Sequence, residues 1–142
     1  MKKILILGAG FGGLRAAVKI AKTLKRLRLD KKYELVLIDK NKYHTYTPLL
    51  YEVATTSKTT ANFCKLHEVA AYNIESLIKR LSVKFIQAEV AGFNAKDGLV
   101  RFKGGEDIIC DFMELALGSE TNYFGIKGLK ENSLPLKYFI DA

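Results

Sequence analysis

The sequence predicts an α/β fold, in which helices flank a parallel β-sheet and a small antiparallel meander is added to it. Three observations lead to this prediction. An apolar run over 3–8 stops at glycine, a helical repeat of apolar residues follows as far as about residue 28, and a second apolar run ends at Asp39. Strand, helix and strand in this order pair in parallel through a right-handed crossover.

The composition is that of an ordinary globular chain. Its 142 residues are 49% hydrophobic and 27% charged, which is usual for a single domain with a core of its own. No apolar run approaches the ~20 residues that a helix needs to cross a bilayer. We therefore expect residues 1–142 to form one domain-sized unit.

The net charge of +8 is concentrated at the start of the chain. Residues 1–32 hold ten Lys and Arg and a single acid, and the remainder is close to neutral. Nucleic-acid binders more often spread basic residues over several elements, so we expect no nucleic-acid partner. Arg15, Lys19, Lys22 and Arg26 instead follow helical spacing, which indicates a basic outer helix face. Such a face is usually only solvated, and attraction to anionic lipid is the alternative.

The remaining elements are read from short local patterns. Pro48 opens an apolar island, typical of a short helix, within an otherwise irregular segment 40–62. Asn73 is a candidate N-cap for a helix over 74–81. The third parallel strand is expected over 83–90, hairpin strands over 98–103 and 107–111, and a last buried strand over 112–118. The tail, 119–142, has the composition of a loop.

Gly8, Gly10 and Gly13 form the pattern GxGxxG between the first strand and the first helix. In a Rossmann-like fold the first glycine permits a tight turn, the second lets a pyrophosphate approach the backbone, and the third lets helix and strand pack closely. The free amides and the dipole of the helix start then hold the anion. The pattern alone is common, but its place between strand and helix is the one this chemistry requires.

Asp39 supplies the acid that the same fold places at the end of the second strand. It lies 26 residues beyond Gly13, against a usual ~20, and a somewhat longer helix accounts for the excess. A carboxylate there accepts hydrogen bonds from ribose hydroxyls; the alternative is a solvated strand end.

The competing interpretation of the first residues as a secretory signal fails, because Arg15 lies where small neutral residues would precede cleavage.

Three further stretches carry a resemblance to a known family. DKNKYHTYTPLLYEVAT follows the acid, FIQAEV precedes the hairpin, and LALGSETNYFGIKG closes the last strand. Together with GAGFGG they resemble the type II NADH dehydrogenases, a branch of the flavoproteins with two dinucleotide-binding domains. The resemblance extends over nearly the whole chain, and it implies a Rossmann-like FAD-binding domain.

The resemblance also implies a role for individual residues. Backbone of the glycine-rich turn would bind the FAD pyrophosphate, Asp39 and Lys40 the adenosine ribose, and the main chain of Val90 the adenine edge. Leu117 and Gly118 would return the chain to the pyrophosphate, with Thr47, Pro48 and Leu49 near the flavin end and His44 between these regions. The turn residues meant are Gly8, Gly10, Phe11, Gly12 and Gly13. A core role for 48–54 and a simple hydrogen-bonding role for His44 remain open.

The cysteines and histidines do not form a second site. Cys64 and Cys110 are far apart, and neither pairs with His44 or His67 in a metal-ligand pattern, so we expect neither a metal nor a catalytic residue in this chain. The close cysteine pair of the disulfide-reductase relatives is missing, which fits electron transfer from flavin directly to a quinone. Glu114 is unexpected within an apolar strand, because a buried unpaired carboxylate is costly.

By this resemblance the chain is the N-terminal part of an FAD-binding domain in a longer enzyme. The NADH-binding domain and a C-terminal membrane segment would lie outside it. The full-length enzyme would pass electrons from NADH through FAD to a quinone, at the cytoplasmic face of the membrane, with a homodimer left open; the fragment alone would be inactive. The alternatives are a reductase of ferredoxin or rubredoxin and a nucleotide-binding module without catalysis.

Overall fold

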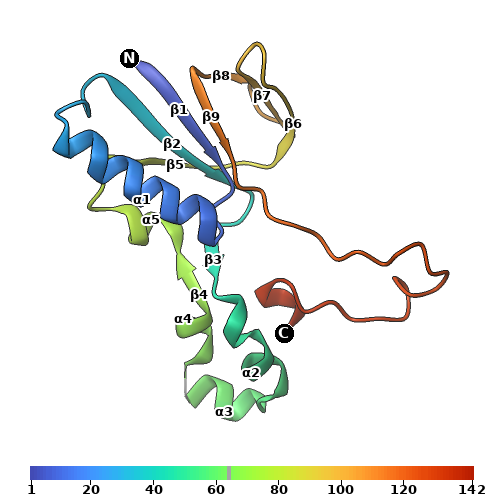
Figure 1. Ribbon diagram of the computed structural model, residues 1–142. Coiled ribbons are helices and arrows are strands. Elements are labelled where there is room, and N and C mark those ends of the chain that lie inside the picture. The colour runs from blue at the N-terminus through green and yellow to red at the C-terminus, as the bar shows by residue number, and fades with distance from the viewer. Residues whose placement is uncertain (64) are drawn as a thin grey trace. The chain divides into compact units, whose positions relative to one another are not determined.

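The structure is a computed structural model that describes residues 1–63 and 65–142, with the side chains of 61–63 and 67 left undescribed. Cys64 and the side chain of His67 thus lie outside the described residues. The chain divides into two compact units, one made of 1–44 with 73–118 and the other of 45–72 with 119–142. The first unit has the α/β architecture that the sequence predicts, as Figure 1 shows.

The first unit is built on a four-stranded sheet whose paired strands all run in parallel (Figure 1). The strand order is β5-β2-β1-β9. The strands are β1 (Lys2–Leu7), β2 (Tyr33–Asp39), β5 (Lys84–Gln87) and β9 (Phe112–Leu115). Successive residues of β1 and β2 are buried, since strands covered on both faces need apolar side chains at every position.

Different elements cover the two faces of this sheet. On one face Ile6, Leu35 and Leu37 pack with α1 (Phe11–Arg26) and α5 (Ile74–Ile78). On the other, Leu5, Leu7, Val36 and Ile38 pack against an antiparallel meander. Its strands are β6 (Val90–Asn94), β7 (Leu99–Phe102) and β8 (Ile108–Ile109). The predicted helix, the meander and the first two buried strands are therefore confirmed. The last strand, expected to be buried over 112–118, instead ends at Leu115 and is exposed at both of its ends.

Two further predicted boundaries are wrong. The strand expected over 83–90 ends at Gln87, and Val90 opens β6 of the meander. The last bond of the parallel ladder runs from the Ala88 amide to the Asp39 carbonyl at 2.9 Å, and Val90 then pairs with Phe102 of β7 instead. The helix expected over 74–81 ends at Ile78. Its predicted cap is confirmed, since Asn73 Oδ1 accepts from the Ser76 amide at 2.9 Å.

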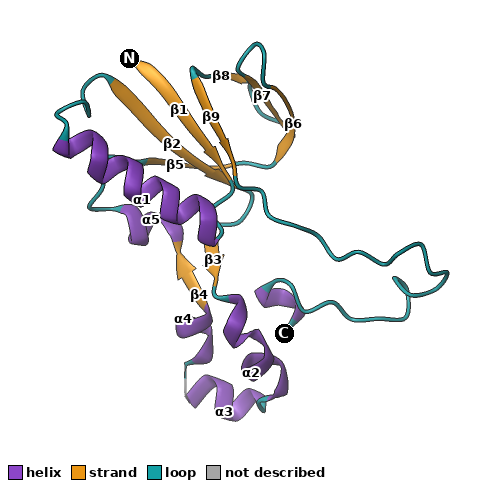
Figure 2. Cartoon of the chain, in the orientation of Figure 1, coloured by secondary structure: helices purple, strands orange, loops and turns teal. Residues whose placement is uncertain are grey.

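The regular elements of the second unit are mainly short helices, drawn purple in Figure 2, and most of its tail is drawn as loop. The short helix expected after Pro48 is confirmed. The irregular character expected for 40–62 is wrong, because a strand and a further helix lie there. The elements are η1 (Thr47–Leu49), α2 (Leu50–Thr55), α3 (Lys58–Phe63), α4 (Leu66–Ala70) and, in the tail, η2 (Phe139–Asp141). Two short strands, β3 (Tyr43–Thr45) and β4 (Ala71–Asn73), pair where the chain passes between the units.

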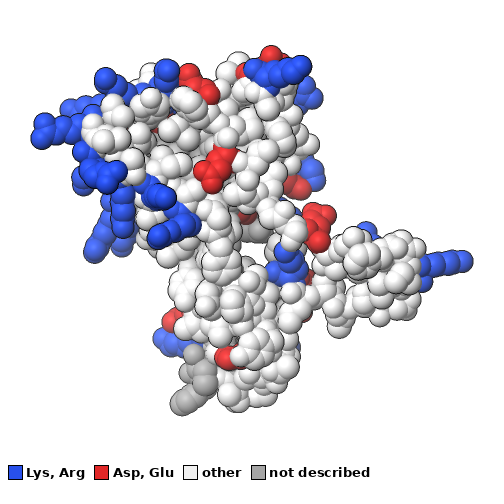
Figure 3. Space-filling model, viewed as in Figure 1, with Lys and Arg blue, Asp and Glu red and all other residues white. Residues whose placement is uncertain are grey.

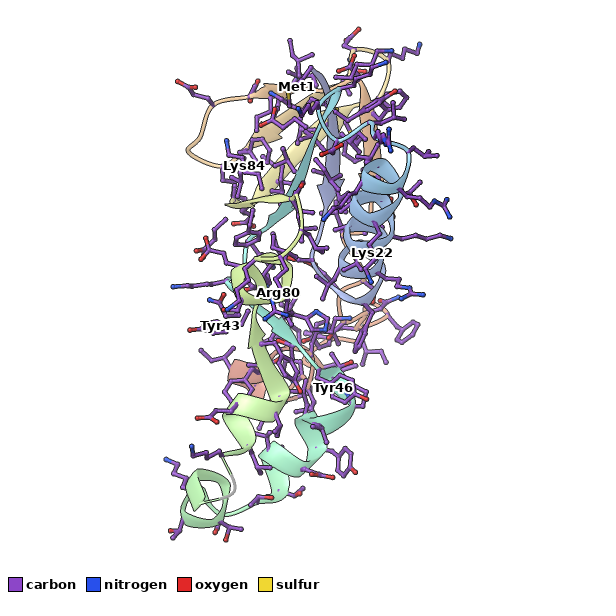
Figure 4. All side chains as sticks on the ribbon, turned by 90° about the vertical axis from the view of Figure 1, so that its left-hand side faces the viewer. Met1, Lys22, Tyr43, Tyr46, Arg80 and Lys84 are labelled. Carbon is purple, nitrogen blue, oxygen red and sulfur yellow. The ribbon has the colours of Figure 1, made fainter. Side chains whose placement is uncertain are left out.

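The predicted basic helix face is present on α1. Arg15, Lys19, Lys22 and Arg26 are all exposed, and the blue of Lys and Arg gathers in Figure 3 on the side where Figure 1 draws α1. Figure 4 labels Lys22 on this helix. Among the described residues, no helix is long and apolar enough to cross a membrane.

Candidate functional site

The site begins at the edge of the sheet where its parallel strands end. The register pairs Leu7 with Ile38 and Leu115, and Asp39 with Gln87, so the carboxyl ends of all four strands meet at one edge. The chain goes from β1 to β2 on one side, while β9 lies on the other side of β1. In open α/β sheets such a switch in strand order leaves a crevice in which ligands bind. The glycine-rich turn follows β1 directly at this point.

Gly8 and Gly13 allow the turn to form. Gly8 has φ +104°, and a Cβ on it would overlap the carbonyl of Ala116, beyond β9. A Cβ on Gly13 would overlap the carbonyl oxygen of Gly8 and lie 3.2 Å from the Ala116 side chain. The tight turn and the close packing predicted for the first and third glycines are thus confirmed.

Gly10 meets no such obstacle. Apart from the adjacent residues and the backbone of the helix itself, no atom of the described residues lies within 4 Å of a Cβ built on Gly10 or Gly12. Gly10 is the N-cap of α1, no side chain caps this helix end, and its first turn holds no acid. The first amides of a helix have no acceptor within it and carry partial positive charge. The turn therefore offers open space and N–H groups, the combination that an anion requires.

Both carboxylate oxygens of Asp39 hold the backbone. Oδ2 accepts a hydrogen bond from the Ala9 amide at 2.7 Å, and Oδ1 accepts one from the Asn41 amide at 2.8 Å. The interpretation of Asp39 as only a solvated strand end is thereby excluded. A carboxylate has about four lone-pair sites, so each oxygen can still accept from a ribose hydroxyl. Asp39 fits the predicted ribose contact while it also shapes the turn.

His44, from β3, lies against the same turn. It is 7% exposed, its Nδ1 is 2.9 Å from the Ala9 carbonyl oxygen, and its ring meets that of Phe11 edge-to-face with centroids 5.0 Å apart. A hydrogen-bonding role for His44, which the sequence left open, is what the structure shows.

The other predicted residues are distributed over both units. Lys40 follows β2, and its carbonyl accepts from Gln87 Nε2 at 3.2 Å. Gly118 has φ +77° with open space around it, and Leu117 is exposed. All predicted residues outside 47–49 belong to the first unit, whereas Thr47, Pro48 and Leu49 form η1 in the second. Contacts of these residues with a cofactor remain predictions.

Among the described residues, no group of His, Cys, Asp and Glu could hold a metal ion. Cys110 is buried in the meander core, where its thiol donates to the Gly98 carbonyl at 3.2 Å. Burial raises the pKa of Cys110, with a further contribution from the negative charge of Asp111. The thiol is thus a core group.

Glu114 is only half-buried on the edge strand β9, so its carboxylate is not cut off from water.

Sequence reasoning did not single out Ala9 or Ala116. Ala9 supplies the backbone groups that Asp39 and His44 hold, and no side-chain pattern marks such a position. Ala116 meets Gly8 and Gly13. The sequence pattern that could have indicated Ala116 is a small residue two positions before Gly118, where the last strand ends.

Comparison with known families agrees with this geometry. Residues 2–142 match the family model described as pyridine nucleotide-disulphide oxidoreductase. The chain belongs to this family. Two staphylococcal relatives are each named type II NADH:quinone oxidoreductase. That of Staphylococcus aureus (strain bovine RF122 / ET3-1) is 35% identical over 99% of the chain, and that of Staphylococcus haemolyticus is 38% identical over 96%. The resemblance inferred from the sequence is therefore confirmed.

Two solved structures share the fold of this chain. NDH2 from Plasmodium falciparum, solved in complex with NADH, matches with a TM-score of 0.75 at 26% identity, over 99% of this chain and 27% of that one. The sulfide:quinone oxidoreductase of Aquifex aeolicus matches with a TM-score of 0.72 at 20% identity, over 99% of this chain and 30% of that one. The chain spans about a third of the length of its staphylococcal relatives, 32% and 31%.

Proposed function

We propose that this chain forms the FAD-binding portion of a flavin-dependent NADH:quinone oxidoreductase. The observation that carries the proposal is the turn of Gly8 to Gly13, at which an uncapped helix start, the open surroundings of Gly10 and the Asp39 carboxylate meet at one edge of the sheet. Relatives at 35% and 38% identity bear the name of this activity.

The residues present fit an adenine dinucleotide. Gly10 and Gly118 leave room for a pyrophosphate to approach the backbone, and the helix start supplies donors and partial positive charge. Asp39 would accept from ribose hydroxyls and would repel a phosphate in their place. FAD is the dinucleotide assigned because 39–55 and 115–128 resemble flavoprotein segments. The main chain of Val90 and the residues Thr47, Pro48 and Leu49 are the further contacts proposed.

FAD, held by the glycine turn and Asp39, would supply the redox chemistry that links NADH to an acceptor. The chain itself orients the dinucleotide and neutralises its phosphates through the helix start. The Cys110 thiol, which is buried in the meander core and whose pKa is raised by that burial, takes no part in the proposed reaction.

The acceptor proposed is a quinone of the membrane. The chain spans about a third of its relatives' length, so binding of NADH, contact with quinone and attachment to the cytoplasmic membrane face are assigned to a longer enzyme of which this chain is the N-terminal part. The name of the relatives supports quinone over ferredoxin or rubredoxin as the acceptor.

A chimera tests this proposal. The segment of the Staphylococcus aureus relative that aligns with this chain is replaced by residues 1–142, and the purified chimera is assayed for bound flavin and for NADH oxidation with a quinone or with rubredoxin. We expect stoichiometric FAD and a quinone-dependent rate. A folded chimera that carries no flavin would contradict the FAD assignment, and a rate that depends on rubredoxin but ignores quinone would favour the reductase alternative. A second chimera that also carries Asp107→Ala, at an exposed acid of the meander, is the control. Its flavin content and its rate should equal those of the first chimera.

A further inference from the structure

Ala9 is held from both sides by side chains that come from outside the turn. Its N–H donates to Asp39 Oδ2 at 2.7 Å, and its carbonyl oxygen is 2.9 Å from His44 Nδ1. Ala9 is 2% exposed and His44 7%. Water is therefore a poor substitute for either partner, and removal of one leaves a buried backbone group unpaired.

These two contacts fix two consecutive peptide planes. In a trans peptide the C=O and the N–H point in opposite directions. The Asp39 contact sets the plane between Gly8 and Ala9, and so directs the Gly8 carbonyl, which packs closely on Gly13. The His44 contact sets the next plane, and so directs the Gly10 N–H away from the imidazole. Gly10 lies in open space at the helix start, where a phosphate would accept from that N–H.

The same contact assigns the tautomer of His44. A carbonyl oxygen only accepts, so Nδ1 must carry the hydrogen. In the neutral ring Nε2 then holds the lone pair. Phe11 meets the ring edge-to-face at 85° and limits its rotation. The imidazole is thus a fixed donor rather than a freely turning surface group.

We propose that His44 is a positioning residue of the dinucleotide site: its Nδ1–H holds the Ala9 carbonyl and thereby orients the Gly10 N–H toward the phosphate. This inference rests on the proposed function for the identity of the ligand. The orientation of the turn does not depend on the ligand and can be measured without it.

Three substitutions separate a donor role from simple packing. His44→Asn removes the ring but places an amide N–H near the position of Nδ1. His44→Phe keeps an aromatic ring and removes the donor, and His44→Gln moves the donor to the position of Nε2. Tyr43→Phe, at the exposed neighbour on β3, is the matched control. If His44 acts only through packing, His44→Phe should have the smallest effect of the three substitutions. If His44 acts as a donor at Nδ1, His44→Asn should have the smallest effect.

The primary readout is the orientation of the Gly10 N–H, because this N–H shares a peptide plane with the Ala9 carbonyl that His44 holds. It is measured as the backbone N–H residual dipolar coupling of Gly10, with those of Ile6 and Leu37 in the same sample as reference. We expect the Gly10 coupling to change in His44→Phe and His44→Gln and to keep the wild-type value in His44→Asn and Tyr43→Phe. Nitrogen shifts of ¹⁵N-labelled His44 should show the Nδ1–H tautomer. FAD affinity, measured by titration, should follow the same ranking.

A Gly10 coupling in His44→Phe equal to that of wild type, or an Nε2–H tautomer, would overturn the proposal. Should His44→Phe fail to fold, the comparison of His44→Gln with His44→Asn decides the same question. Absence of FAD binding in the wild type would count against the proposed function alone, because the Gly10 coupling and the tautomer still report the His44 contact. FAD affinities that do not follow the ranking while the Gly10 coupling does would overturn the role of His44 in binding and leave a structural contact.

Discussion

The carboxylate of Asp39 and the amide of Ala9 are joined by a 2.7 Å hydrogen bond across 30 residues of sequence. The end of β2 therefore holds the turn that follows β1, in addition to its proposed contact with a ribose. One side chain thus links the shape of the turn to recognition of its ligand, and a substitution at Asp39 is expected to affect both.

Asp39→Ala should lower the free energy of unfolding and weaken FAD binding. The Ala9 amide is buried and loses its acceptor, which costs about 1–3 kcal/mol, whereas the exposed Asn41 amide can bond to water instead. Urea unfolding measures the first effect and FAD titration the second. Asp107→Ala, which removes the same charge from an exposed loop position, should change neither by more than about 0.5 kcal/mol. Equal effects of the two substitutions would remove the special role of Asp39.

Gly13→Ala should destabilise the fold strongly. The new methyl group would overlap the backbone carbonyl of Gly8, which cannot turn away as a flexible side chain could, and we expect a loss of about 3 kcal/mol or more. Gly12→Ala is the control, because the space around it is open. There the better helix propensity of alanine should stabilise the protein by about 0.5–1 kcal/mol. Similar melting temperatures for the two variants would contradict the close approach of turn and helix.

Gly10→Ala should separate folding from binding. Its φ of −69° is accessible to alanine, and no atom lies within 4 Å of the added Cβ, so the melting temperature should stay close to that of wild type. The methyl group would instead occupy the space proposed for the pyrophosphate, and FAD affinity should fall by about tenfold or more. Calorimetry and titration on the same sample measure both. Affinity equal to wild type would place the phosphates elsewhere.

Cys110 should make stability fall as the pH rises. Burial, with the charge of Asp111, raises the pKa of Cys110 in the folded state, so the folded protein keeps the thiol proton where the unfolded chain loses it. The contribution of the Cys110 proton to the free energy of unfolding is complete below the pKa of the unfolded thiol, about 8.5. It is lost as the pH rises through the pKa of the folded thiol. Urea unfolding between pH 7 and 10 should show a steeper decline in wild type than in Cys110→Ser. Parallel curves for the two proteins would contradict the raised pKa.

The sequence predicted the elements whose pattern is local. The buried strand, the glycine turn and the amphipathic helix were read correctly as far as Arg26, because period and glycine spacing are set within a few residues of one another. The ends of the strand over 83–90 and of the helix over 74–81 were misplaced, since such ends depend on pairing with distant residues, as that of Val90 with Phe102. Segment 40–62 was read as irregular because helices of five or six residues carry too little periodicity to recognise.

For the site, residue identity was predictable and orientation was not. Gly8, Gly13 and Asp39 were found because a backbone conformation, a close approach and a charge each require a particular residue type. The contact of His44 with the Ala9 carbonyl joins a side chain to a main-chain group 35 residues away. No pattern of residue types records such a pair, and only the fold brings it together.

The central claim is that the turn after β1 binds an adenine dinucleotide, and a titration of the ¹⁵N-labelled chain with FAD tests it most directly, since amide shifts report even weak binding. The account predicts saturable shifts at Gly8, Gly10, Gly12, Gly13 and Gly118, reproduced by ADP-ribose and weakened in Gly10→Ala. Saturable shifts confined to other residues, or no shifts at millimolar FAD, would contradict it.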